Sequence, residues 1–236
     1  MKNIPSTPKC RECIIKNNAI FVHLKKDEIE MLEMEKTCLH HKRGTLLYQE
    51  GYRINGFYCI YKGIVKLYKT GIEGKEQIIK FAKGGDIIGY RSILSNEMAC
   101  TTAKIIEDST LCYIPAEVLI KLVKTNTNFS MELIKLACQE LKEANNFITD
   151  IAQKSVRERL AEILVYLKID FDLENDGVLH ISLTREEIAN MVGTATESVI
   201  RLLSEFKADK LIELKGRKIK IINLPGLMKV ASIYNN

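Results

Sequence analysis

Two short helices separated by a glycine are predicted between Ser182 and Ala208, and this pair constrains the fold more than any other part of the chain. Thr184 is a good N-cap residue, and Glu187 three positions later completes a capping box, so a helix is expected to begin here. Gly193 is expected to end it, because glycine adopts the left-handed backbone of a helix C-terminus without strain. Both ends of this helix are therefore specified locally.

A second capping box, formed by Thr194 with Glu197, is expected to open the next helix. Apolar residues recur along one side of each helix, which predicts that the two pack on a shared core. Two short helices joined by a glycine turn make a helix-turn-helix, whose second helix enters the DNA major groove N-terminus first. The expected core residues are Ile188, Ala189, Val192, Val199, Leu202, Leu203 and Phe206.

The opposite face of the second helix carries the residues expected to read bases, which are Thr196, Glu197, Ile200 and Arg201. A guanidinium can donate two hydrogen bonds to guanine, and a carboxylate can accept one from cytosine, so Arg201 and Glu197 can read adjacent base pairs. Helix capping by Glu197 and a surface ion pair of Arg201 are the structural alternatives. Both are compatible with DNA contact.

A short hairpin is predicted next, with Leu211–Leu214 and Arg217–Ile222 flanking Lys215 and Gly216. This is the expected position of a wing. From Arg201 onward there are eight cations against three acids, which favours a phosphate partner, although a solvated charged surface has the same composition. The residues expected to contact phosphates without reading sequence are Thr184, Arg185, Ser198, Lys215, Arg217 and Lys218.

Short β-rich runs punctuated by glycine occupy the region from Gly44 to Pro115, which predicts an all-β domain. An amphipathic helix is expected before it, over Lys25–Glu35. The predicted strands are Phe57–Tyr61, Ile64–Tyr68, Gln77–Phe81, Thr102–Ile106 and Leu111–Ile114.

After Pro115 the apolar residues recur at steps of three and four, without an intervening glycine or proline, which predicts one long helix. Its apolar stripe needs a partner along its whole length, and a second copy of the helix supplies one in a coiled coil. The alternative is that the stripe packs on the β domain of its own chain. The stripe consists of Phe129, Leu133, Leu136, Ala137, Leu141, Ala144 and Ile148.

The predicted organisation is α+β, with four parts along 236 residues. The parts are an N-terminal segment at 1–22 with a Cys-x-x-Cys motif, a β domain at 23–125, a dimerisation helix at 126–154 and a winged helix-turn-helix at 155–236. Another helix is expected over Ser155–Lys168, followed by a polar loop over Phe171–Gly177. No apolar run approaches the roughly 20 residues that cross a bilayer, so we expect a cytoplasmic protein without membrane contact.

This order of parts, together with three motifs, resembles the family of the cyclic-AMP receptor protein and the fumarate-nitrate reduction regulator, from Cys10 to about Lys229. The motifs are Gly84–Gly89, Ser155–Leu160 and Leu183–Leu211. The resemblance implies a β-roll like a cyclic-nucleotide-binding jelly roll, a homodimer on a palindromic operator, an effector or redox signal that gates DNA binding, and contact with RNA polymerase. It also places Glu197 and Arg201 at the family's base-reading positions and so implies a TGA-like core in each half-site.

The other two residues expected to read bases, Thr196 and Ile200, depart from the family pattern. Thr196 replaces the extra arginine of the cyclic-AMP type, so the flanking base preference is expected to differ. Ile200 stands where both well-known relatives have a small residue, and its apolar side chain can meet a thymine methyl. The outer bases of the operator are therefore left open.

At the effector site the resemblance is weaker, because the nucleotide-binding residues of the cyclic-AMP type are replaced. The position after Gly89 is Tyr90 rather than a ribose-binding glutamate, and the Arg-Ser pair for the phosphate is replaced by Ala99 and Cys100. Without a cation the phosphate loses its main partner, and Arg91 is the one nearby candidate. Cyclic AMP is therefore not the expected effector.

Seven cysteines without a secretory signal predict reduced thiols rather than a disulfide framework. Cys10, Cys13 and Cys112 match three ligands of the iron-sulfur cluster in the oxygen-sensing branch of the family, but the fourth position is Ala19. We therefore expect a mostly colourless protein, with an oxygen or nitric oxide sensor as the alternative. Lys9, Arg11 and Lys16 flank the cysteine pair and are expected to favour thiolates; His23, His40 and His41 are candidate haem ligands or ordinary surface residues.

Two other classes of function compete with a transcription regulator. An enzyme is not expected, because no nucleophile-base pair and no complete metal triad is visible in the sequence. A purely structural interaction module would lack sequence-specific binding to DNA, which a footprint detects.

Overall fold

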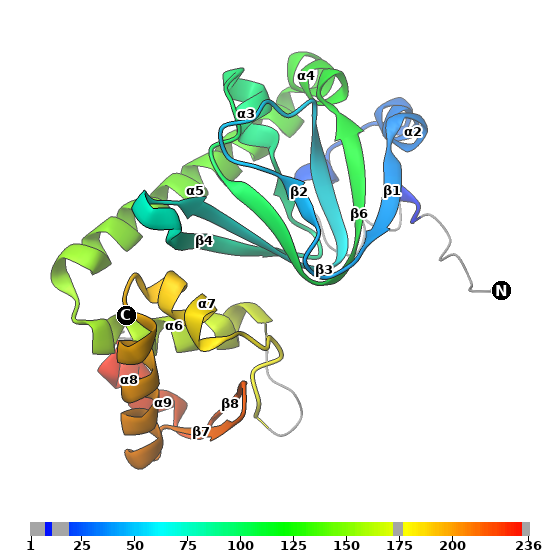
Figure 1. Ribbon diagram of the computed structural model, residues 1–236. Helices are drawn as coiled ribbons and strands as arrows, with labels where there is room; N and C mark the ends of the chain where they lie inside the picture. The colour runs from blue at the N-terminus through cyan, green and yellow to red at the C-terminus, as the bar shows by residue number, and fades with distance from the viewer. Residues whose placement is uncertain (1–7, 11–18, 172–176, 233–236) are drawn as a thin grey trace. The chain divides into compact units, whose positions relative to one another are not determined.

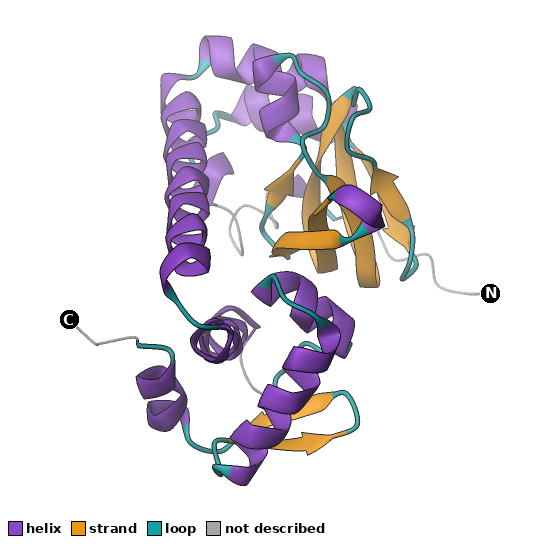
Figure 2. Cartoon of the chain, turned by 60° about the vertical axis from the view of Figure 1, so that its left-hand side comes forward, coloured by secondary structure: helices purple, strands orange, loops and turns teal. Residues whose placement is uncertain are grey.

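The computed structural model describes residues 8–10, 19–171 and 177–232. The chain forms two compact units, which divide between Leu141 and Lys142 (Figure 1). The first contains an antiparallel sheet with its covering helices, and the second contains helices and a two-stranded hairpin (Figure 2). The predicted order of a β domain, a long helix and a helix-turn-helix is thus confirmed.

The sheet of the first unit is antiparallel in all its pairings, with β6 and β3 at its centre. Strand β6 pairs with β1, β2 and β3, while β3 also pairs with β4 and β5. The strands are β1 Thr37–His41, β2 Leu46–Tyr48, β3 Gly56–Thr70, β4 Glu76–Lys83, β5 Ile87–Ile88 and β6 Thr102–Pro115.

Strands β3 and β6 are longer than predicted, because each one joins two of the predicted strands. Their pairing shifts register between Ile60 and Val65, where the alternation of apolar residues is interrupted. Gly63 lies in this irregular segment with φ of 101°, and a Cβ at this residue would lie 2.1 Å from the Ser109 hydroxyl. A bulge, rather than a turn, therefore explains the glycine.

Among the described residues of the first unit, two apolar clusters contribute to its core. One includes Val65, Ala103 and Ile105 from the central strands. The other joins the sheet, through Phe57 and Ile114, to the helices that pack against it. Besides the start of the long helix that follows, the helical segments that the structure describes in this unit are η1 Ala19–Phe21, α2 Lys26–Glu35, η2 Ile72–Gly74, α3 Tyr90–Ser95 and α4 Ala116–Thr125.

The long helix α5, Thr127–Gln153, is continuous as predicted (Figure 2). Its first turns pack on the β domain, because Phe129 and Leu133 are buried in the same cluster as Phe57. The prediction that these two residues serve self-association is therefore wrong, and the alternative of packing within the chain holds for them. Leu136 and Ala137 are half-buried, while Leu141, Ala144 and Ile148 are exposed.

The second unit is built on α6, which contacts α7, α8 and α9. Strands β7 and β8 pair antiparallel with Lys215 opposite Lys218, which confirms the predicted hairpin. The predicted loop over Phe171–Gly177 lies mostly outside the described residues. The elements are α6 Val156–Phe171, α7 Arg185–Val192, α8 Thr196–Ala208, β7 Ile212–Lys215, β8 Lys218–Ile221 and α9 Leu224–Val230.

Candidate nucleic-acid interface and effector pocket

The capping box at the start of α7 is formed as predicted. The Thr184 hydroxyl accepts a hydrogen bond from the Glu187 backbone N–H at 3.0 Å, and a Glu187 carboxylate oxygen accepts one from the Thr184 N–H at 2.7 Å. Gly193 ends the helix in the left-handed conformation with φ of 72°. Local signals therefore fix both ends of α7.

The second capping box is not formed, which corrects the prediction for Thr194 and Glu197. Helix α8 begins one residue later than expected, with Ala195 as N-cap and without a side-chain cap. Glu197 is consequently the second residue of the helix, and its side chain is exposed. This carboxylate lies where the partial positive charge of a helix N-terminus favours an anion.

The side chains of α8 divide between core and surface as the helical periodicity of its apolar residues predicts. Val199, Leu202, Leu203 and Phe206 are buried against the rest of the unit. On the opposite side, Glu197 and Ile200 are exposed, the Arg201 side chain is 68% exposed, and Thr196 and Ser198 are half-buried. Their contact with bases or phosphates stays a prediction.

Arg201 forms the surface ion pair that the sequence analysis gave as an alternative, and this pair belongs to a longer chain of charges that the sequence analysis missed. Its Nη1 lies 2.6 Å from Glu205 Oε1, while Glu205 Oε2 accepts from Arg157 Nη1 at 2.9 Å. Arg157 also pairs with Asp209 at 2.6 Å and stacks 4.8 Å above the Phe206 ring. Arg157 thereby ties α6 to α8. The spacing of four between Arg201 and Glu205 is the sequence feature that indicates the ion pair.

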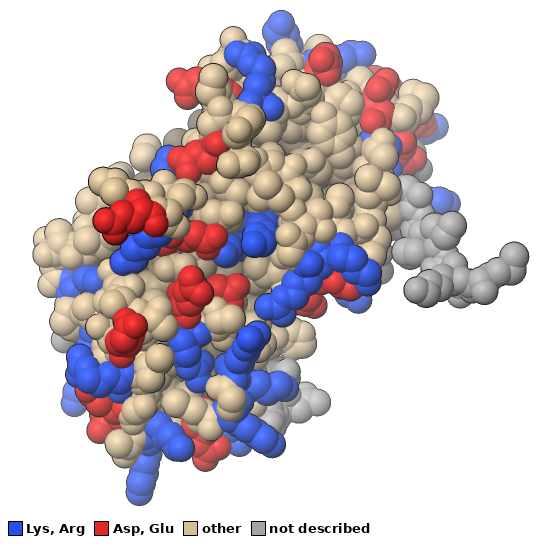
Figure 3. Space-filling view, in the orientation of Figure 1, with Lys and Arg blue, Asp and Glu red and all other residues tan. Residues whose placement is uncertain are grey.

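The predicted phosphate contacts fall into two groups. Thr184 uses its hydroxyl within the capping box, where it also lies 3.0 Å from Glu187 Oε2. Arg185 donates to the carbonyl oxygens of Gly216 at 2.9 Å and of Arg217 at 3.5 Å, so it joins α7 to the tip of the hairpin. Lys215, Arg217 and Lys218 are exposed at that tip. Figure 3 shows many lysine and arginine side chains on the second unit.

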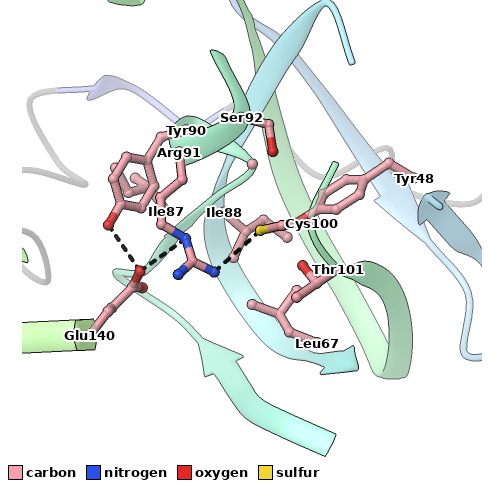
Figure 4. Close-up of a pocket in the computed structure, with 11 residues that line it drawn as sticks. Tyr48, Leu67, Ile87, Ile88, Tyr90, Arg91, Ser92, Cys100, Thr101 and Glu140 are labelled. Carbon is pink, nitrogen blue, oxygen red and sulfur yellow. Dashed lines mark hydrogen bonds and ion pairs between the residues drawn. The ribbon is translucent and has the colours of Figure 1, made fainter. Parts of the chain in front are cut away.

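A pocket lies in the first unit, where Gly89 leads from β5 into α3 with φ of 85° (Figure 4). Four of the five predicted effector residues line it, namely Gly89, Tyr90, Arg91 and Cys100. Ala99 does not; it is buried, and its backbone bonds to the backbone of Gly51 and Tyr52. The complete lining is Tyr48, Leu67, Ile87, Ile88, Gly89, Tyr90, Arg91, Ser92, Cys100, Thr101 and Glu140.

Glu140 of α5 supplies the carboxylate of this pocket, and the sequence analysis missed it. Its Oε2 accepts from the Tyr90 hydroxyl at 3.0 Å and lies 3.3 Å from Arg91 Nε, while Oε1 lies 3.4 Å from Lys80 Nζ (Figure 4 draws the first two). Burial, and then the Glu140 charge, raise the pKa of Tyr90, so this phenol stays protonated and donates. Glu140 follows the buried Leu133 by seven residues, so both lie on the same face of α5. This spacing is the sequence feature that places Glu140 on the side that packs on the β domain.

The first unit contains a disulfide between Cys38 and Cys112, which corrects the expectation of reduced thiols for this pair. The two residues face each other across β1 and β6 although 74 positions separate them, so no local pattern indicated the bond. Cys112 is thereby removed from the cluster ligands implied by the resemblance. Cys13 lies outside the described residues.

The described residues do not fit a four-thiolate cluster. Burial raises the pKa of Cys10, although Lys36 donates to its sulfur at 3.2 Å, so the expected thiolate is not favoured. Ala19 offers no donor side chain. Within the described ranges, no group of three or more His, Cys, Asp and Glu residues is placed to bind a metal ion.

The candidate haem histidines have carboxylates or each other as neighbours. His23 lies 3.9 Å from Glu132, and His40 lies 3.9 Å from Asp108. Burial, and then His40, lower the pKa of His41. Separately, no helix among the described residues is long and apolar enough to cross a membrane.

Two family models match the chain, and together they follow its two units. The model of the cyclic nucleotide-binding domain matches residues 38–126, and that of the Crp-like helix-turn-helix domain matches residues 158–230. The first range contains the pocket beside Gly89, and the second contains α7, α8 and the hairpin.

Similar proteins extend the match to nearly the whole chain. The fumarate and nitrate reduction regulatory protein of Vibrio cholerae is 28% identical over 95% of this chain and 90% of its own length, and that of Yersinia pestis is 29% identical over 94% and 90%. A putative transcriptional regulator of the crp/fnr family from Eubacterium rectale has a similar structure, with a TM-score of 0.75, 21% identity, and coverage of 91% and 98%. The chain is therefore a transcription regulator of the Crp/Fnr family, with an effector-binding domain and a helix-turn-helix DNA-binding domain.

Proposed function

We propose that this regulator binds a palindromic operator as a homodimer, and that a small effector in the Arg91 pocket controls its binding. The observation that carries the proposal is the exposed face of α8. Glu197, Ile200 and Arg201 are all exposed in the N-terminal half of this helix. These three side chains differ in chemistry, so each one can recognise a different feature of the major groove. RNA polymerase is a further partner that family membership supports.

The bases are read, in this proposal, by charged and apolar contacts from successive turns of α8. Arg201 donates to guanine N7 and O6, and Glu197 accepts from cytosine N4. Ile200, which is 49% exposed, contacts a thymine methyl, because an exposed apolar side chain gains by burial against it. Thr196 lies at the start of the helix and contacts the flanking base pair.

Phosphates are bound by the N-terminal side of α8 and by the hairpin. Ser198 and the cations Lys215, Arg217 and Lys218 face the backbone, and Arg185 positions the hairpin tip through its two carbonyl contacts. Such contacts set the register of the protein on DNA without reading sequence. Thr184 contributes its backbone position rather than its hydroxyl, which is used in the capping box.

A second copy of the chain is the partner that best matches the exposed stripe of α5. Ile134, Cys138, Leu141 and Ile148 are all exposed, and they are separated by four, three and seven residues. This is the heptad spacing of a two-stranded coiled coil. In a parallel pair, Cys138 lies opposite its counterpart, so mild oxidation should cross-link the wild-type dimer and leave Cys138→Ser uncrosslinked. Absence of that cross-link in the wild type would contradict a parallel pair in this register.

The effector pocket is coupled to α5 through Glu140. A ligand that binds Arg91 through an acidic group must compete with the Glu140 carboxylate for the same guanidinium. Binding then removes one of the polar contacts between α5 and α3. The conformational equilibrium of α5 therefore shifts toward states in which this contact is absent. The pocket therefore links an effector to the helix that carries the dimer stripe.

The experiment that tests the operator proposal is selection from random duplex DNA, followed by footprinting. We expect a two-fold-symmetric sequence whose half-sites lie roughly one helical turn apart, about 10 base pairs from centre to centre. A shape-matched control is the Glu197→Gln variant, which should select the same half-site spacing with a changed cytosine preference. Enrichment of no sequence, or of a single unpaired half-site, would contradict the proposal.

A further inference from the structure

Three cysteines lie side by side across three neighbouring strands of the first unit. Cys112 of β6 faces Cys38 of β1 on one side, where the disulfide joins them. On its other side it faces Cys59 of β3 in the same register. The strand order β1-β6-β3 therefore makes Cys112 the middle member of this cysteine row.

The three side chains share one face of the sheet, because residues paired in register on neighbouring strands project to the same side. Cys59 packs against the apolar cluster that includes Phe57 and Ile114, which lie two positions along the same strands. Cys112 is only 5% exposed, whereas Cys38 and Cys59 are half-buried. The outer members can therefore meet a small molecule more readily than the middle one.

We propose that the cysteine row is a reversible thiol-disulfide exchange site that reacts with small-molecule disulfides and moves its bond between β1–β6 and β6–β3. Thiol-disulfide exchange proceeds by attack of a thiolate on one sulfur while the other sulfur leaves. Neighbouring strands are about 4.8 Å apart, and the row runs along this direction. Cys59 consequently approaches Cys112 from the side opposite Cys38.

The exchange within the row needs no external oxidant. The Cys59 thiol loses its proton, its sulfur attacks Cys112, the Cys38–Cys112 bond breaks, and Cys38 leaves as a thiolate that takes up a proton. The oxidation state of the protein is unchanged, because one disulfide and one thiol are present before and after the exchange. The product contains a Cys59–Cys112 disulfide and a Cys38 thiol.

Formation of the disulfide from reduced protein uses a small-molecule disulfide as the oxidant. The Cys38 thiolate attacks it and forms a mixed disulfide, and one small thiol leaves. Cys112 then attacks Cys38, forms the protein disulfide and releases the second small thiol. Two protein thiols are oxidised and one small-molecule disulfide is reduced to two thiols, so the step balances.

The location of the bond determines what connects β1 to the sheet. Within the described part of the chain, β1 pairs only with β6, over Thr37–His41. When the disulfide lies between Cys38 and Cys112, it adds a covalent link to this edge strand. When it lies between Cys59 and Cys112, or is reduced, only backbone hydrogen bonds and side-chain packing connect β1 to β6.

The test uses the full chain with the other four cysteines changed to serine (Cys10, Cys13, Cys100 and Cys138). The reduced protein is treated with oxidised glutathione, quenched with acid and mapped by mass spectrometry. We expect Cys38–Cys112 in the Cys59→Ser variant and Cys59–Cys112 in the Cys38→Ser variant. Cys112→Ser should give glutathione adducts without an internal disulfide.

When Cys38, Cys59 and Cys112 are all present and the other four cysteines are serine, both the Cys38–Cys112 and the Cys59–Cys112 disulfides should be found at equilibrium. Circular dichroism establishes that each serine variant is folded before its linkage is read. If folded Cys38→Ser formed only glutathione adducts, or if the intact row gave Cys38–Cys112 alone, exchange across Cys112 would be refuted. Amide hydrogen exchange supplies a second measurement: faster exchange over Thr37–His41 in Cys38→Ser than in Cys59→Ser supports the proposal, and equal exchange contradicts the effect on β1.

Discussion

Arg201 and Glu205 form an ion pair one turn apart on α8, with 2.6 Å between Nη1 and Oε1. Pairs of this type on an exposed helix are worth only about 0.3–0.5 kcal/mol, so DNA can break this one at small cost. Glu205 also accepts from Arg157, which keeps its carboxylate in place. The arginine that we propose to read a base is therefore oriented in the absence of DNA by Glu205, which is not among the residues proposed to contact bases.

We expect Arg201→Ala to relax the preference for one base pair in each half-site. Loss of a bidentate contact to guanine should cost about 1–3 kcal/mol against the preferred operator and much less against a substituted one. Competitive binding to operators that differ at each position measures this. An unchanged preference at every position would show that α8 does not dock as proposed.

Substitution of Glu205 should have the opposite effect on affinity. Glu205→Gln removes both the carboxylate that competes for Arg201 and one negative charge near the DNA phosphates, so operator affinity should rise about twofold to threefold at low salt. Asp209→Asn is the matched control, because it removes the same charge from Arg157 but leaves the Arg201 pair intact. Equal gains in the two variants would mean that charge alone, rather than release of Arg201, explains the effect.

Lys218→Ala should weaken binding to all DNA sequences alike. Lys218 is exposed beside the hairpin tip and can contact only the phosphate backbone in this proposal. Removal of one phosphate contact should reduce the slope of log affinity against log salt by about 0.9. Titrations of operator and random DNA at several salt concentrations test this, and a loss confined to the operator would contradict it.

Glu140→Gln tests the coupling between the pocket and α5. Glu140 is 12% exposed and meets Tyr90, Arg91 and Lys80, so removal of its charge should destabilise the first unit by about 1–3 kcal/mol. Amide exchange in the middle of α5 should become faster. Glu143→Gln, three residues along the same helix, is the control with the same charge change. Similar exchange in both variants would argue against a special role for Glu140.

The local features of the fold were predictable from the sequence, because their causes lie within a few residues. The capping box of Thr184 with Glu187 and the turn at Gly193 are examples. The start of α8 was misplaced by one residue, since Ala195 rather than Thr194 is its N-cap and no cap hydrogen bond marks it. Strands β3 and β6 were each divided in two, because a bulge and a turn interrupt the apolar alternation in the same way.

The long-range features of the candidate sites were not predictable. Glu140 joins the pocket because α5 packs on the β domain, which depends on contacts distant in sequence. The Cys38–Cys112 bond likewise depends on the register of two strands. Burial also reversed the expected pKa direction of Cys10, since the sequence shows neighbouring charges but not the environment of the thiol.

The division of the α5 stripe between core and surface yields the last prediction. Leu141 and Ile148 are 61% and 64% exposed, whereas Leu133 is 2% exposed. The double variant Leu141→Asp with Ile148→Asp should place unpaired charges at the proposed dimer interface, so sedimentation should show a folded monomer with much weaker operator binding. Leu133→Asp should instead unfold the first unit, because its charge would be buried among Phe129 and the residues of that cluster. A double variant that stays dimeric would remove the exposed stripe from the interface. If Leu133→Asp gave a folded monomer, Leu133 would have to be counted as part of the dimer interface.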